Sequence, residues 1–333
     1  MKLRTDWNEK LRTTNWNEQS WGRVRARRAR WVGLFSRLYA NGILRIPRGH
    51  YYSPVVSVKE MQREASRIFD GSLRDLPGID LNAEGQLALV RQLAQLYHEQ
   101  PFGEMPRNGL RYFFDNLWYG RADGLFLFCL MRLLRPSRIV EIGSGFSSAV
   151  MLDTNERFFD GRIRLTFIEP DTRRLHALLK DSDRERVTIV EQRIQHVDPS
   201  VVDTLEANDI LFVDSSHVVK AGSDVNHIVF ELLPRLAPGV VVHFHDVLYP
   251  FEYPRQWFEL GVSWNEPYLL RAFLQYNPRF VIRLWNDFLM RFHADTLRAL
   301  MPLCVDRPPF GVGGSLWLQT RNEEDACGAS ADR

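Results

Sequence analysis

The sequence lacks three features that would each assign it to a special class of protein. No stretch approaches the roughly 18 to 20 uninterrupted apolar residues of a membrane-spanning helix, and MKLRTDWNEK has no apolar core of a secretory signal. The three cysteines, Cys129, Cys304 and Cys327, lie far apart without a C-x-x-C pair, so neither a disulfide framework nor a thiolate zinc site is indicated. We therefore expect a cytoplasmic globular protein with reduced thiols.

The chain also lacks a strong overall charge, since its formal net charge is +2. Positive charge is concentrated in residues 1–30, where Lys and Arg clearly outnumber Asp and Glu. Such an arm can contact nucleic acid or an anionic surface, although a solvated arm is the simpler interpretation. Nucleic acid is not an expected partner, because the rest of the chain has no basic stripe interleaved with aromatic residues.

Glycine, proline and charge divide the chain into four predicted parts. We expect a basic N-terminal arm over residues 1–50, a helical cap over 51–110, an α/β domain over 111–321 and a disordered tail over 322–333. Apolar residues at helical spacing predict buried helices within 81–102 and 124–134. The 45% of hydrophobic residues are sufficient for a large core.

Short β-rich runs alternate with helical segments through the α/β domain. The runs are RIVEI (138–142), IRLTFIE (163–169), VTIVE (187–191), DILFVD (209–214), GVVVHFHD (239–246), RFVIRLW (279–285) and GGSLWLQT (313–320). Helical sequences separate the first five, including 147–158, 171–181 and 224–236. This order predicts a doubly wound, seven-stranded, mostly parallel sheet with an N-terminal helical extension. The last two runs form a closing pair with an antiparallel edge.

The stretch RIVEIGSGFSS forms a glycine turn directly after the first strand. Gly143 and Gly145 allow a ligand to approach the backbone, but the third small position of a pyrophosphate fingerprint is Ser148. Glu141 precedes the turn and Glu169 ends the second strand, where a carboxylate can accept both hydroxyls of a ribose. The turn therefore indicates a nucleoside site more clearly than a diphosphate site.

These motifs resemble a known family. E-x-G-x-G, an acid ending the second strand and Asp214 ending the fourth look like a class I S-adenosylmethionine-dependent methyltransferase with a Rossmann-like fold. The stretch from DILFVDSSH to FHDVLYPFEYP is similar to the bacterial branch of macrocin and sugar O-methyltransferases and cephalosporin-hydroxylase-like proteins. The resemblance implies S-adenosyl-L-methionine as cofactor. It assigns cofactor binding to Glu141, Gly143, Ser144, Gly145, Ser147, Ser148, Glu169 and Asp214. Arg193 stands where many relatives keep an acid near the adenine.

Methyl transfer from a sulfonium requires an aligned acceptor and a group that removes the acceptor's proton. The fourth and fifth strands end in candidates for this second task, and the catalytic residues that we predict are Asp214, His217, His245 and Asp246. In macrocin-type relatives, acids at these two strand ends hold magnesium, which implies a Mg²⁺ or other divalent metal site at Asp214, His245 and Asp246. A metal-free base, His245 or His217, and a purely structural cluster are the alternatives. His243 is expected to be a core residue.

The resemblance predicts O-methylation of a small-molecule, natural-product or glycan hydroxyl. The aromatic segment with Tyr249, Phe251, Tyr253, Trp257 and Trp264 can line the acceptor pocket, or it can pack within the chain or in a homo-oligomer. Two other functions stay open at this point. One is a nicotinamide-dependent oxidoreductase on a similar sheet, and the other is a nucleic-acid-directed methyltransferase or binding protein that uses the basic arm.

Overall fold

The computed structural model describes residues 48–305 and 313–322, which form parts of two compact units. One unit is Met1–Ser72 with Glu252–Trp264, and the other is Leu73–Phe251 with Asn265–Arg333. The first contains α3 (Val58–Arg63), α4 (Ala65–Ile68) and α10 (Arg255–Glu259). The basic arm and the predicted disordered tail lie outside the described residues, except for residues 48–50 and 322. Among the described helices, none has the length and apolar content needed to cross a membrane.

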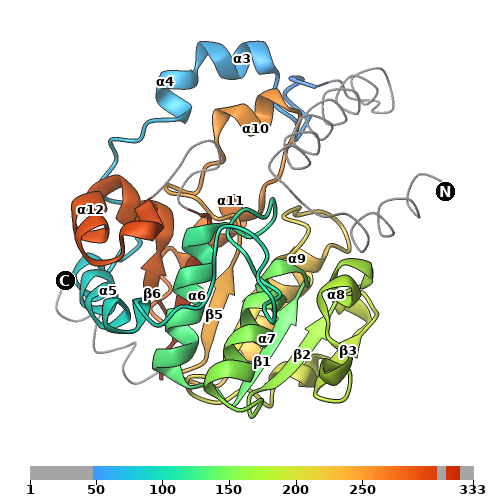
Figure 1. Cartoon of the computed structure of the whole chain (residues 1–333). Coiled ribbons are helices and arrows are strands. Elements are labelled where there is room, and N and C mark those ends of the chain that lie inside the picture. The colour runs from blue at the N-terminus through green and yellow to red at the C-terminus, as the bar shows by residue number, and fades with distance from the viewer. Residues whose placement is uncertain (1–47, 306–312, 323–333) are drawn as a thin grey trace. The chain divides into compact units, whose positions relative to one another are not determined.

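The second unit is built around a seven-stranded sheet with the order β3-β2-β1-β4-β5-β7-β6 (Figure 1). Its strands are β1 (Arg138–Ile142), β2 (Arg164–Ile168), β3 (Val187–Val190), β4 (Ile210–Val213), β5 (Val241–Phe244), β6 (Phe280–Trp285) and β7 (Leu316–Thr320). The first five pair in parallel, and β7 lies antiparallel between β5 and β6. The predicted fold class, a Rossmann-like methyltransferase sheet, is confirmed, including the antiparallel closing pair.

The central strands form where the sequence has continuous apolar runs. Every residue of β4 and β5 is buried, as expected for parallel strands covered on both faces. The chain order reverses direction at β1, because β2 and β3 lie to one side of it and β4 and β5 to the other. In such sheets ligands bind beyond the carboxyl ends of the strands at this switch point, which is where the glycine turn follows β1.

The helices that cover the sheet include α5 (Ala83–Tyr97), α6 (Arg121–Leu134), α7 (Phe146–Phe158) and α8 (Arg173–Leu178). Helix α6 packs between α5 and α7, and Figure 1 shows α6 and α7 in front of the sheet. The segment predicted as one helix over 224–236 is divided into α9 (Asp224–His227), a π-helical turn η4 (Ile228–Leu232) and a 3-10 turn η5 (Leu233–Arg235). Pro234 explains why the segment ends in the 3-10 turn η5, because proline has no backbone N–H to donate to a helical hydrogen bond. Helices α11 (Glu266–Leu274) and α12 (Asn286–Leu300) were not predicted.

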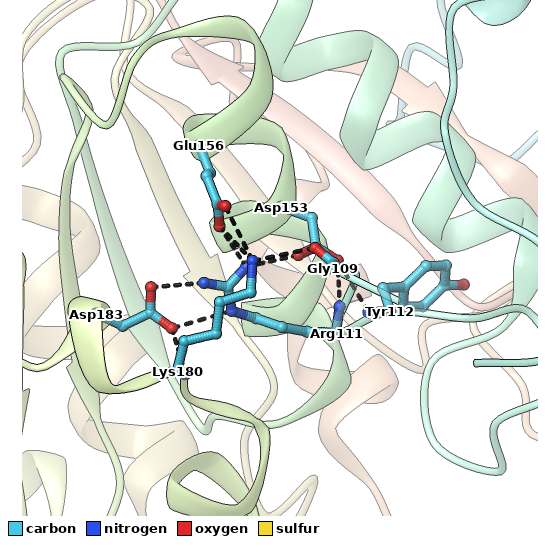
Figure 2. A network of polar contacts seen from close by, with 7 residues as sticks. All are labelled: Gly109, Arg111, Tyr112, Asp153, Glu156, Lys180 and Asp183. Atoms are coloured by element: carbon cyan, nitrogen blue, oxygen red, sulfur yellow. Dashed lines mark hydrogen bonds and ion pairs between the residues drawn. The ribbon is translucent and has the colours of Figure 1, made fainter. Parts of the chain in front are cut away.

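A buried ion cluster ties the segment before α6 to α7 and to the 3-10 turn η1 (Asp181–Asp183), as Figure 2 shows. The side chain of Arg111 is only 2% exposed and donates to Asp153 (2.7 Å), Asp183 (2.6 Å) and Glu156 (2.8 Å). Lys180 adds a second cation on Glu156 at 2.8 Å. Three elements that are distant in sequence therefore share one set of charges, and removing the central cation leaves two carboxylates buried without it.

We expect Arg111→Met to destabilise the protein by about 3 to 5 kcal/mol, because Asp153 and Asp183 stay buried after their cation is lost. Urea unfolding measures this difference. Arg162→Met is the matched control, since Arg162 and Asp160 form an exposed pair with side chains 75% and 81% exposed. That change should cost at most about 0.5 kcal/mol. An equal small loss in both variants would show that the cluster in Figure 2 contributes no more than a surface pair.

Candidate active site

The turn after β1 passes very close to the end of β4. Gly143 has a φ of +81°, and a Cβ atom built on it would lie 2.0 Å from the carbonyl oxygen of Asp214. The N–H of Asp214 donates to the carbonyl of Ile142 at 2.8 Å, so the two strands are still paired where the turn begins. Both the left-handed backbone and the contact require glycine. Gly143 therefore fixes the distance between the turn and the Asp214 strand end.

Glu141 is fully buried and holds the turn from inside the protein. Its carboxylate accepts hydrogen bonds from the hydroxyls of Ser147 (2.5 Å) and Ser148, and Ser148 in turn accepts the N–H of Gly145 at 2.9 Å. Burial raises the pKa of Glu141 to about 8, although the two serine hydroxyls act in the opposite direction. Through these contacts Glu141 organises the glycine turn. Its direct contact with the cofactor stays a prediction.

Glu169 lies beside the glycine turn at the end of β2. One carboxylate oxygen accepts the N–H of Ser144 at 3.2 Å, and the other accepts the N–H of Asp171 at 2.7 Å. A half-buried carboxylate thus occupies the position expected for a ribose acceptor, and the ribose contact stays a prediction. Glu191 is the carboxylate that directly follows β3, whereas Arg193 is exposed.

The ends of β4 and β5 bring two acids and one imidazole together. The His217 ring lies with Nε2 3.4 Å from an oxygen of Asp214 and 3.9 Å from an oxygen of Asp246, while Nδ1 is 2.8 Å from the buried carboxylate of Glu266. Ser215 donates to the other Glu266 oxygen at 3.0 Å and accepts the N–H of His217. The residue that stands between the two predicted acids is therefore His217, which has a left-handed φ of +60°.

The acids and the histidines of this cluster shift each other's pKa values. Burial lowers the pKa of His217, but the contacts with Asp214 and Glu266 outweigh it and hold that pKa well above its ordinary value. Burial raises the pKa of Asp214, but the positive charges of His245, His217 and Arg174 outweigh it and lower that pKa. The neighbouring acids thus favour the protonated, cationic form of the His217 ring.

The two other histidines of this edge have pKa values that are shifted in opposite directions. His245 has Nε2 3.7 Å from Asp246, and despite burial the neighbouring acids raise its pKa. His243 is fully buried, stacks on Phe212 with ring centroids 3.8 Å apart and has Nε2 2.9 Å from the hydroxyl of Ser315. Burial, and then the charge of His245, lowers the pKa of His243 well below its ordinary value. His243 is therefore a neutral core residue, as expected.

The predicted metal site, Asp214, His245 and Asp246, lies at the ends of β4 and β5. Over residues 48–305 and 313–322, no three His, Cys, Asp or Glu side chains are grouped so that they could hold a metal ion. Nε2 of His217 lies 3.4 Å from Asp214 and 3.9 Å from Asp246, so the His217 ring, and not that of His245, stands between the two acids. The donor set at Asp214, His245 and Asp246 therefore does not support a resident divalent metal.

The aromatic segment is divided between the two compact units. Tyr249 and Phe251 are buried in the core against Trp285, with ring centroids 5.2 and 4.6 Å apart. Tyr253 and Trp257 belong to the other unit, where their rings stack at 5.3 Å. Packing within the chain thus accounts for Tyr249 and Phe251.

Three residues of this edge were missed by the sequence analysis. Glu266 begins α11 and is 1% exposed. Its only signal in the sequence is its place before Pro267, which indicates the start of a helix. Asp123, in the first turn of α6, accepts hydrogen bonds from Ser315 (2.5 Å) and Asn286 (2.9 Å), and burial raises its pKa to about 6. The third, Arg174, lies against the glycine turn. No spacing in the sequence links any of them to the strand ends.

Comparison with known proteins agrees with this geometry. A family model described as a methyltransferase domain matches residues 140–247, which contain the glycine turn and the ends of β1, β2, β4 and β5. An uncharacterized protein of Archaeoglobus fulgidus is 35% identical over 170 residues, covering 49% of this chain and 75% of the archaeal protein.

Solved structures include two similar chains. The methyltransferase PaMTH1 of Podospora anserina, bound to SAH, covers 79% of this chain and 97% of its own, with a TM-score of 0.39 and 16% identity. The O-methyltransferase TomG of Streptomyces achromogenes, in complex with SAM and involved in tomaymycin synthesis, covers 79% and 99%, with a TM-score of 0.41 and 16% identity.

The sheet order, the glycine turn and the matched domain lead to one class. The chain belongs to the class I S-adenosylmethionine-dependent methyltransferases, and it shares a family with the archaeal protein. The oxidoreductase alternative is thereby set aside. The narrower bacterial branch suggested by the sequence stays a prediction.

Gly143→Ala should destabilise the fold by about 3 kcal/mol or more, because alanine adds both a strained φ and a clash with the Asp214 carbonyl. Gly222→Ala is the control, since Gly222 has a φ of +69° but no atom within 4 Å of the added Cβ. It should cost only roughly 1 to 2 kcal/mol for the backbone. Urea unfolding of both variants separates the contact from the strain. Equal losses would argue against the close approach of β1 and β4.

Glu141 should make stability depend on pH. Its pKa rises from 4.5 to about 8 on folding, so the folded state binds the proton more tightly, and the stabilisation present below pH 4.5 is lost as the pH rises through 8. Glu141→Gln cannot titrate and should lack this decline. We expect the free energy of unfolding to fall between pH 5 and pH 8.5 by roughly 3 to 5 kcal/mol more in the parent than in the variant. Parallel pH curves would contradict the burial of an ionisable Glu141.

Proposed function

We propose that the protein transfers the methyl group of S-adenosylmethionine to a hydroxyl of a small-molecule, natural-product or glycan acceptor. The observation that carries the proposal is the His217 ring at the ends of β4 and β5, with Glu266 on one nitrogen and Asp214 and Asp246 near the other. This ring lies on the same strand end that Gly143 approaches, next to the expected cofactor turn.

The reaction asks for two things. The sulfonium is already an activated methyl donor, so the protein must align the acceptor oxygen with the methyl carbon and accept the hydroxyl proton as the new bond forms. An imidazole whose Nδ1 is held by a buried carboxylate is suited to the second task, because the carboxylate fixes the ring and stabilises the imidazolium that results. Glu266 supplies that carboxylate at 2.8 Å.

His217 is accordingly the proposed proton acceptor, through Nε2. Its pKa, raised well above the ordinary value, makes the neutral ring a strong base but a minor species at neutral pH. The rate should therefore increase as the pH rises toward the pKa of His217. A divalent metal would instead lower the pKa of a bound acceptor hydroxyl, but the donor set among the described residues does not support one.

The test is methyl transfer from radiolabelled S-adenosylmethionine to a panel of phenols and methyl glycosides. His217→Ala should lower the rate by about 10²- to 10⁴-fold, because the general base is lost, while S-adenosylhomocysteine still binds in calorimetry. Glu266→Gln should lower the maximum rate and move the rising limb of the pH profile to lower pH, because the carboxylate that raises the His217 pKa is removed. His98→Ala, an exposed histidine after α5, is the control.

Chelation separates the two versions of the chemistry. Treatment with EDTA should leave the rate unchanged if His217 accepts the proton. Loss of activity with EDTA and its return with Mg²⁺ would overturn the assignment in favour of the metal site at Asp214, His245 and Asp246. A His217→Ala variant as active as the parent would refute the base as well.

A further inference from the structure

Arg174 and Trp118 form a pair beside the glycine turn that the proposed chemistry does not use. The guanidinium carbon of Arg174 lies 3.9 Å from the centroid of the Trp118 ring. A Cβ atom built on Gly145 would lie 3.1 Å from Cδ of Arg174 and 3.5 Å from its Nη1. Arg174 comes from the start of α8 and Trp118 from the segment before α6, so two separate segments meet over the turn.

We infer that Arg174, positioned over the ring of Trp118, binds the α-carboxylate of the methionyl part of S-adenosylmethionine. The inference rests on the proposed function, because it assumes that this cofactor occupies the glycine turn. It extends that function by assigning the carboxylate of the cofactor to Arg174, which belongs neither to the glycine-turn motif nor to the strand ends.

The charges of the edge explain why a cation is needed there. The turn is flanked by the carboxylates of Glu169 and Asp214, both partly exposed. These acids attract the sulfonium and ammonium of the cofactor but repel its carboxylate. Arg174 is close enough for its charge to act on Asp214, so it can pair with a carboxylate bound at this point.

The position of Arg174 over the Trp118 ring suits this role. A guanidinium can stack one face on an aromatic ring and still present its N–H edge to a carboxylate, which a lysine ammonium cannot do as a planar pair. Trp118, 45% exposed, would thus set the plane of the Arg174 fork before the cofactor arrives. The neighbouring Arg173 has a different partner, since its guanidinium donates to Asp171 at 2.5 Å.

Calorimetry with three adenosine ligands tests the inference. S-adenosylhomocysteine carries the ammonium and the carboxylate, its decarboxylated analogue carries only the ammonium, and 5′-methylthioadenosine carries neither. In Arg174→Gln the Kd of S-adenosylhomocysteine should rise about 10- to 100-fold, as expected for a lost charged hydrogen bond. The Kd of the other two ligands should change less than about twofold. Trp118→Ala should give a smaller loss with the same ligand pattern, because it only releases the plane of the guanidinium.

Arg173→Gln is the matched control and should leave all three Kd values unchanged. Equal losses for S-adenosylhomocysteine and 5′-methylthioadenosine in Arg174→Gln would overturn the inference, because Arg174 would then act on the adenosine or on the fold. Unchanged binding of S-adenosylhomocysteine would overturn it too. If the parent protein binds none of the three ligands, the proposed function fails instead, so the two failures are distinguishable.

Discussion

The site depends on the contact between the turn after β1 and the carbonyl of Asp214. At Gly143 the backbone leaves no room for a side chain. The close approach of the turn to Asp214 brings the expected cofactor turn and the acid–imidazole cluster to one point of the sheet. The glycine turn can meet a cofactor only beyond the end of β1, and the acid–imidazole cluster begins one strand away, at the end of β4. Because β1 and β4 are adjacent and parallel, their carboxyl ends lie at the same edge of the sheet. Glu141 then fixes the turn from below through Ser147 and Ser148.

The second constraint is charge. Carboxylates accumulate at this edge because strand ends and helix starts both favour them, and each additional one raises the cost of ionising its neighbours. Two kinds of cation lie near these carboxylates. The acids raise the pKa values of His217 and His245 and so favour their charged forms, whereas Arg174 is charged at any pH. A titrating cation can take part in proton transfer, and a permanent cation can hold a ligand charge. This difference in chemistry matches the two ends of the site.

The sequence predicted the parts of the fold that depend on local pattern. The strands followed from short apolar runs such as DILFVD, and their shared edge followed from the rule for parallel sheets. The division of 224–236 into three helical types was not predictable from its apolar spacing, because the π turn depends on packing. Glu266 could not be found either. It is 49 positions from His217 and reaches it only because the chain returns to this edge at the start of α11.

The metal prediction failed to gain support for a related reason. His245 and Asp246 do lie close, with Nε2 of His245 3.7 Å from an Asp246 oxygen, but the ring that stands between Asp214 and Asp246 is that of His217. What determines the charge between the acids is the left-handed backbone at His217, three residues after Asp214. A left-handed backbone at a residue other than glycine costs some free energy. The pattern of residue types around His217 does not predict this conformation.

The three histidines of the edge follow a gradient that is set by their acidic neighbours. His243, in the interior of β5, contacts a hydroxyl and an aromatic ring, so burial dominates and the ring stays neutral. His245, at the end of that strand, is near Asp246, and its pKa rises. His217 contacts Asp214 and Glu266 directly, and its pKa rises furthest. Proton affinity therefore increases from the core toward the edge. The neutral form of His217 is thus the most basic of the three rings, while the lowered pKa of His243 keeps positive charge out of the sheet.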